Sequence, residues 1–122
     1  MDSNVTCYSI PGGRRPIPLG VGAIDFGRYI AHSELPVVVD FWAGWCAPCR
    51  AMAPAFTATA ARLGPGVRFA KVDTEANGAL AAHHGIRSIP TLILFRAGKE
   101  VARQSGALSR EQIEAWLVPL LG

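Results

Sequence analysis

Two cysteines, Cys46 and Cys49, are separated by two residues in the segment Trp45-Cys46-Ala47-Pro48-Cys49-Arg50. A strand-like run ends just before this segment and a helix-like run starts within it, so both sulfurs fall in the first turn of a helix. There the unpaired backbone amides and the positive end of the helix dipole stabilise a thiolate and lower the pKa of a thiol. Cys46, at the helix start, is expected to be exposed, with Cys49 beneath it and within disulfide reach.

These positions predict thiol–disulfide exchange, with a different role for each cysteine. The Cys46 thiolate attacks a target disulfide, and Cys49 then resolves the mixed disulfide and releases the reduced target. Pro48 suits this arrangement, because a proline in the first helical turn removes no hydrogen bond and fixes the backbone that holds the sulfurs at bonding distance. Its place at a strand-to-helix junction also argues against two buried cysteines that act only as small apolar residues.

A cysteine pair at this spacing is ambiguous by itself, because it is also half of a zinc knuckle. A zinc site needs four ligands, and none of the other candidate ligands has the spacing of a second knuckle. Those candidates are Cys7, His32, His83 and His84. We therefore expect no bound metal, and interpret His83-His84 as a polar helix end before Gly85.

The elements that must position the cysteines follow from hydrophobic patterning. The run 37–42 is β-branched or aromatic except at Asp40, which indicates a central strand covered on both faces. The alanine-rich run 47–63 predicts a long helix that Pro54 should kink. The final helix should begin at a Ser109 and Gln112 capping box and fray at Pro119. Further strands are predicted over 67–72, 91–95 and 100–104, and further helices from Ile24 to before Ser33 and over 73–81.

This order, β-α-β-α-β-α-β-β-α, predicts an α/β sandwich with a mixed sheet, in which parallel crossovers precede an antiparallel hairpin. With 122 residues, 50% of them hydrophobic, the chain fits one domain. We expect that domain over residues 23–122. Residues 1–22 are expected to form an irregular tail because prolines and glycines interrupt them, although Ile17 and Leu19 could form a short edge strand.

Composition excludes several function classes. A charged content of 17% and a net charge of +3 are ordinary for a globular chain. The basic pair Arg14-Arg15 lacks interleaved aromatics, so no nucleic-acid partner is expected. We expect no membrane association, because no run approaches the roughly 20 apolar residues of a membrane span. The N-terminus lacks the pattern of a secretory signal, and three cysteines do not make a secreted disulfide framework, which together predict a cytoplasmic protein.

The motifs taken together resemble the thioredoxin family. The matching blocks keep the family's order and cover about residues 24–121: Val39-Asp40-Phe41-Trp42-Ala43, Trp45 to Arg50, Ala53-Pro54, Ala70-Lys71-Val72-Asp73, Gly85 to Thr91, and Gly106-Ala107. The resemblance implies the thioredoxin fold, a three-layer α/β/α sandwich with a central mixed sheet. It also implies a protein-disulfide reductase, expected to be monomeric, with no bound cofactor beyond a Cys46–Cys49 redox disulfide. A thioredoxin reductase that uses NADPH would keep it reduced.

Two blocks, Leu35-Pro36-Val37-Val38 and Arg87 to Thr91, are more similar to the bacterial thioredoxin-2 subgroup than to thioredoxin-1. That subgroup often begins with a zinc ribbon built from two CxxC pairs. Only Cys7 lies in the corresponding region here, so the ribbon is not expected. Ala47 stands where the family usually has glycine, which is expected to shift the redox potential.

The resemblance also implies a supporting shell. Asp40 and Lys71 match a buried pair behind the second cysteine, where the carboxylate acts as a base toward that thiol. Strand alternation makes such a pairing geometrically possible. Burial should raise the pKa of Asp40, and Lys71 should oppose that shift. The alternative is a solvated aspartate at a strand end with an outward-reaching lysine.

Pro90 matches a proline that is cis in thioredoxins and packs against the cysteine pair. The preceding backbone, at Ile89, is then free to pair with an extended substrate segment. Trp45, Ile89, Gly106 and Ala107 would form an apolar docking surface around Cys46. Simple core packing is the alternative for Trp45.

Two rival functions remain. Disulfide oxidases and isomerases usually carry another residue where Pro48 stands and work outside the cytosol, so Pro48 argues against that function. A non-catalytic binding or chaperone module with the same apolar surface would need neither Cys46 nor Cys49. The sequence therefore favours a reductase.

Overall fold

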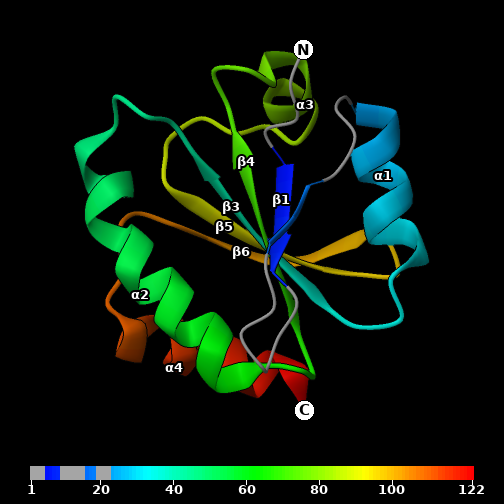
Figure 1. Ribbon diagram of the computed structural model, residues 1–122, viewed down its shortest axis with the longest axis vertical. Helices are drawn as coiled ribbons and strands as arrows, with labels where there is room; N and C mark the ends of the chain where they lie inside the picture. The colour runs from blue at the N-terminus through cyan, green and yellow to red at the C-terminus, as the bar shows by residue number, and fades with distance from the viewer. Residues whose placement is uncertain (1–4, 9–15, 19–22) are drawn as a thin grey trace.

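The computed structural model describes residues 5–8, 16–18 and 23–122 (Figure 1). The described part consists of strands and helices in the following order: β1 Val5–Tyr8, β2 Pro16–Pro18, α1 Ala23–His32, β3 Val37–Trp42, α2 Ala47–Leu63, β4 Arg68–Asp73, α3 Gly78–His83, β5 Thr91–Arg96, β6 Lys99–Ser105 and α4 Arg110–Leu121. From β2 onward this is the predicted alternation.

The strands form one six-stranded sheet in the order β2-β1-β4-β3-β5-β6. Strands β3 and β4 are parallel, whereas β5 is antiparallel to both β3 and β6. The sheet is therefore mixed, as expected. The central position of β3 explains its nearly continuous apolar sequence, because helices cover both of its faces.

Strand β1 was not predicted. It pairs antiparallel with the edge of β4 and with β2, so the expectation of an irregular tail was wrong at residues 5–8. The short edge strand expected at Ile17 is present as β2. The prolines of β2 lie in the outermost strand, where a missing N–H is tolerated. The expected strand residue Leu19 lies outside the described residues. The division into a tail and a domain at residue 23 stays a prediction.

Two helical layers cover the sheet, with α1 and α3 on one face and α2 and α4 on the other (Figure 1). Alternate residues of β3 serve the two layers: Val37, Val39 and Phe41 face α1, and Val38 faces α2. The first core includes Phe26, Ile30, Leu80, Ile93 and Phe95, and the second includes Met52, Phe56, Leu94, Ile113 and Leu117. The three-layer α/β/α architecture is thus confirmed.

Several element boundaries follow from side-chain hydrogen bonds. The Ser109 and Gln112 capping box is present at the start of α4, which continues past Pro119 to Leu121, so the predicted fraying is not seen. Helix α3 begins at Gly78 rather than at Asp73. The carboxylate of Asp73 accepts a hydrogen bond from the Glu75 amide (2.9 Å), and such local bonds compete with helix formation.

His84 is the C-cap of α3, which confirms the predicted helix end, but its side chain is half-buried rather than a solvated polar group. Its ring packs edge-on against Phe26 and Phe95, with centroid separations of 5.8 and 5.4 Å, and lies 5.9 Å from Phe41. His83, by contrast, is exposed. His84 is therefore a half-buried member of the core on the α1 side of the sheet.

This environment disfavours the charged form of His84. Burial is the main cause that lowers its pKa, with help from the nearby charges of His83 and Arg103 and against the opposing charge of Glu100. When the pH falls below the ordinary histidine value of 6.5, the unfolded chain therefore binds its proton before the folded chain does. Folding stability from this group is complete above pH 6.5 and is lost as the pH falls toward the folded-state pKa.

The free energy of unfolding is expected to fall less between pH 7.5 and pH 5.5 in His84→Phe than in the wild type. Phenylalanine keeps the aromatic packing and removes the titrating group. Urea unfolding at the two pH values measures the effect as a difference between the wild type and the variant. His32→Gln, in an exposed position of α1, is the matched control and should leave the wild-type dependence unchanged. An identical pH dependence in His84→Phe would contradict this assignment.

Candidate active site

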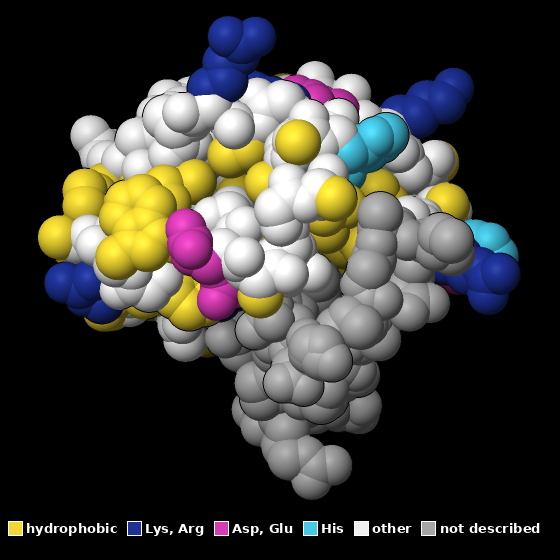
Figure 2. Space-filling view, turned by 90° about the horizontal axis from the view of Figure 1, so that it is seen from above, with side chains coloured by type: hydrophobic (Ala, Val, Ile, Leu, Met, Phe, Trp, Pro, Cys, Tyr) yellow, Lys and Arg dark blue, Asp and Glu magenta, His cyan; other side chains and the backbone are white. Residues whose placement is uncertain are grey.

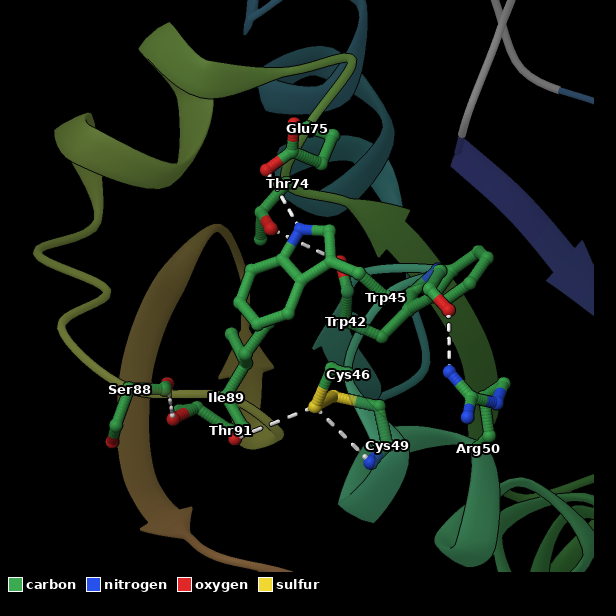
Figure 3. The surroundings of a disulfide bond; sticks show 11 residues. Trp42, Trp45, Cys46, Cys49, Arg50, Thr74, Glu75, Ser88, Ile89 and Thr91 are labelled. Atoms are coloured by element: carbon green, nitrogen blue, oxygen red, sulfur yellow. Dashed lines mark hydrogen bonds between the residues drawn. A yellow bond between two sulfur atoms is a disulfide. The ribbon is translucent and has the colours of Figure 1, made fainter.

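The local sequence fixes the geometry of the cysteine pair (Figure 3). Cys46 is the N-cap of α2, with extended backbone angles (φ −88°, ψ 107°), and Ala47 and Pro48 are the first two helical residues. The amide of Cys49 donates a hydrogen bond to Cys46 Sγ (3.2 Å). The two residues form a disulfide across a Cα separation of 5.3 Å. The helix start therefore holds the sulfurs together and points a backbone dipole at Cys46.

Neither cysteine is broadly exposed: 4% of Cys46 and 2% of Cys49 is accessible to solvent. The expectation of an exposed Cys46 was wrong in that sense, because Ala43, Trp42 and Ile89 pack around the pair. Access differs in another way. Cys46 lines a pocket of about 470 Å³, and Cys49 does not. Cys46 is thus the sulfur of the pair that borders the pocket.

The loop before β5 forms one wall of the site. Its Ile89–Pro90 peptide is cis, the isomer that the resemblance implied. The Ile89 carbonyl oxygen lies 3.8 Å from Cys46 Sγ. The Gly106 amide donates to the Pro90 carbonyl oxygen (2.9 Å), which ties the loop to the end of β6. The Ile89 backbone thus lies directly against the sulfur of Cys46.

The pocket is largely apolar. Its lining residues are Trp45, Cys46, Ala47, Pro48, Thr74, Ala81, Ile86, Arg87, Ser88 and Ile89. Figure 2 looks onto this end of the molecule, where hydrophobic side chains gather beside acidic ones. Of the predicted docking residues, Trp45 and Ile89 reach the pocket. Gly106 and Ala107 do not line it, although Gly106 bonds to Pro90.

Trp45 is a surface residue, since 66% of it is exposed, so the core-packing alternative was wrong. Its indole Nε1 donates a hydrogen bond to Glu75 Oε2 at 2.8 Å (Figure 3). Glu75 was not identified from the sequence. It lies 30 positions away from Trp45, and no local signal marks such a contact. The bond fixes the orientation of the indole that forms one side of the pocket.

Glu75→Ala is expected to free the indole and raise the KM for a protein disulfide by about two- to tenfold, the equivalent of one hydrogen bond. Glu75→Gln keeps an acceptor oxygen at the same reach and should retain most of the wild-type KM. Insulin reduction measures both variants, and Trp45 fluorescence reports the indole environment. Equal KM values for all three proteins would show that the hydrogen bond does not shape the pocket.

Asp40 is fully buried and lies opposite Lys71 in the register of β3 and β4. Neither carboxylate oxygen has a hydrogen-bond partner among the described residues. Burial raises the pKa of Asp40 from 3.8 to about 7, and the positive charge of Lys71 opposes the rise. The alternative of a solvated aspartate was therefore wrong. The Lys71 ammonium lies 4.9 Å from the centre of the Trp42 ring, in a cation–π contact.

Among the described residues, no group of three or more histidine, cysteine, aspartate and glutamate side chains could hold a metal ion. In the same part of the chain, no helix is both long and apolar enough to span a membrane.

A helix-capping cysteine disulfide beside a cis-proline loop, carried by a mixed sheet between two helical layers, defines a thiol–disulfide oxidoreductase. Comparison with known proteins identifies the family. The thioredoxin family model matches residues 20–118. The chain belongs to the thioredoxin family, and its activity is the reduction of protein disulfides through the Cys46–Cys49 pair.

Individual relatives agree. Thioredoxin C-3 of Corynebacterium nephridii is 49% identical over 100 residues, which are 82% of this chain and 68% of that protein. A thioredoxin of Haemophilus influenzae is 39% identical over 95 residues, 78% of this chain and 89% of that protein. The solved structure of a mutant thioredoxin from Halobacterium salinarum superposes with a TM-score of 0.73 at 28% identity, covering 83% of this chain and 87% of the other.

Proposed function

We propose that Cys46 Sγ is the atom that attacks target disulfides and that Cys49 resolves the intermediate. The observation that carries this assignment is the pocket, which Cys46 lines and Cys49 does not. The Cys46 thiolate displaces one target sulfur as a thiolate and forms a mixed disulfide with the other. Cys49 then attacks Cys46 Sγ, which frees the second target thiol and leaves the Cys46–Cys49 disulfide. Two electrons pass from the pair to the target.

Asp40 is the proposed base for Cys49 in the second step, with Lys71 as its partner. A pKa of about 7 lets the carboxyl group exist in both protonation states near neutral pH, as a general base requires. Asp40 shares a strand face with Val38, which packs against α2, the helix that carries Cys49. Pro48 fixes the helix start, and Pro90 with Ile89, Trp45, Gly106 and Ala107 receives the target.

The oxidised pair must be reduced again after each cycle. We propose that an NADPH-dependent thioredoxin reductase supplies the electrons and that the protein acts as a cytoplasmic monomer on protein disulfides. Membership of the thioredoxin family supports this pathway, since it is the one the family generally uses. We also propose that the protein is a member of the thioredoxin-2 subgroup, which two sequence blocks resemble.

A coupled assay tests this function. The protein, insulin, a bacterial thioredoxin reductase and NADPH are combined, and NADPH oxidation is followed. Turnover that requires all four components supports the proposal. No turnover with this reductase, but turnover with glutathione and glutathione reductase, would contradict the proposed electron donor. Cys7→Ser is the control, because it removes a thiol outside the proposed pair and should leave the rate unchanged.

A further inference from the structure

The Cys46 pocket carries one charged lining residue, Arg87, on the wall that leads to Ile89. Arg87 is exposed, and it makes no hydrogen bond or ion pair with any residue that the structure describes. Other arginines are occupied: Arg50, Arg62 and Arg96, for example, each donate to a carbonyl or carboxylate oxygen. The guanidinium of Arg87 is therefore available to a molecule that enters the pocket.

Nothing within the described pocket neutralises this charge. The remaining lining side chains are apolar, carry a hydroxyl group, or belong to Cys46, whose sulfur is in the disulfide. The neighbouring carboxylate, that of Glu75, accepts the indole hydrogen bond of Trp45 and is held on the Trp45 side of the site. On the loop before β5, the pocket thus presents the unpaired guanidinium of Arg87. On the Trp45 side, the carboxylate of Glu75 is already hydrogen-bonded to Trp45.

We propose that Arg87 is a specificity-determining residue that favours target disulfides with an acidic side chain near the attacked cysteine. The inference rests on the proposed attack by Cys46. A target sulfur must approach Cys46 through the pocket. The residues next to the target cysteine then lie close to Arg87, which lines the same pocket. A guanidinium that is unpaired in the free protein can form a forked ion pair with a carboxylate without first breaking an ion pair or hydrogen bond to the protein.

The expected preference is modest because the ion pair is partly exposed. Pairs of this kind correspond to factors of about 1.4 to 5 in an equilibrium constant. Charge attraction during encounter acts in the same direction. An acidic target is therefore expected to exceed an otherwise identical basic target by about three- to tenfold in kcat/KM at low salt, since the basic residue is also repelled. Screening should shrink this ratio in 0.5 M salt.

Three disulfide peptides test the proposal. They are identical except for Asp, Asn or Lys at the position that follows the target cysteine, and kcat/KM is measured for each with the reduced protein. The ratio of the Asp to the Lys peptide within one variant cancels any change in the intrinsic rate. Arg87→Gln should bring this ratio close to one, Arg87→Glu should invert it, and Arg87→Lys should restore part of it.

Arg28→Gln is the matched control, because it removes the same charge from an exposed position of α1 outside the pocket. It should keep the wild-type ratio. An unchanged ratio in Arg87→Glu overturns the proposal, and so does an equal loss in Arg28→Gln, which would show a long-range effect of net charge. If the wild type reduces none of the three peptides, the proposed function itself fails; if it reduces all three equally, only the selectivity does.

Discussion

Asp40→Asn is expected to raise the free energy of unfolding at pH 8 by about 4 kcal/mol. The pKa of Asp40 is 3.8 in its ordinary state and about 7 when folded. A difference of about three pKa units corresponds to about 4 kcal/mol at 1.36 kcal/mol per unit. Above pH 7 the wild type must hold a buried carboxylate without a hydrogen-bond partner, whereas asparagine is neutral at every pH.

The sign of this effect depends on pH. Between pH 3.8 and about 7 the folded wild type binds the Asp40 proton and the unfolded chain does not. The stability of the wild type therefore falls as the pH rises through this window, and the gain from Asp40→Asn grows from near zero at pH 4 to its full value at pH 8. Guanidinium unfolding at pH 4, 6 and 8 measures it. Equal stabilities of the two proteins at pH 8 would show that Asp40 ionises without penalty.

The same substitution is expected to slow the second chemical step. Asparagine cannot accept a proton from Cys49, so the inflection near pH 7 in the rate of mixed-disulfide resolution should disappear. Lys71→Gln provides the matched variant. It removes the charge that opposes the pKa rise of Asp40, so the inflection should move to higher pH. A stability change without a changed pH profile would make Asp40 a structural residue only.

Stability and activity are thus opposed at Asp40. A buried group without partners lowers the stability of the fold, but the same burial brings its pKa into the range in which a base works. The sequence predicted a raised pKa for Asp40 if this carboxylate is buried in the apolar run. The depth of its burial follows from the position of the run in the centre of the sheet, which the strand pattern alone does not determine.

Local signals in the sequence were sufficient for the elements that hold the cysteines. The helix over 47–63 and the strand over 37–42 were predicted with the bounds that the structure shows, because each is fixed by residues within it or next to it. The same holds for the capping box of α4, in which Ser109 and Gln112 are three residues apart. The chemistry of the pair could therefore be inferred before the fold was known.

Features that depend on distant residues could not be predicted. Strand β1 is stabilised by the open edge of β4, which lies more than sixty positions away, so its own sequence gives little indication of it. The Trp45 to Glu75 hydrogen bond and the burial of His84 among phenylalanines from α1, β3 and β5 are of the same kind. They arise from tertiary packing, and they shape the pocket and the pH dependence.

Cys46→Ser is expected to abolish disulfide reduction, with a loss on the order of 10³-fold or more, because the attacking sulfur is removed. Cys49→Ser should still attack through Cys46 but cannot resolve the product, so it should accumulate a covalent complex with the target. Both variants are best made with Cys7→Ser, so that one thiol remains in each. Non-reducing gels and mass spectrometry of the complexes measure the outcome.

The difference expected between the two variants tests the assigned roles, because only one of the two cysteines lines the pocket. Cys46 lines it and contacts the Ile89 carbonyl oxygen, while Cys49 has its own amide bonded to Cys46 Sγ and no access from the pocket. A trapped complex in Cys46→Ser and none in Cys49→Ser would reverse the roles. Trapping in both variants would show that the sulfurs are equally accessible once reduced. If both variants reduce insulin as fast as the wild type does, neither sulfur is needed for the effect. Only the non-catalytic binding function would then remain.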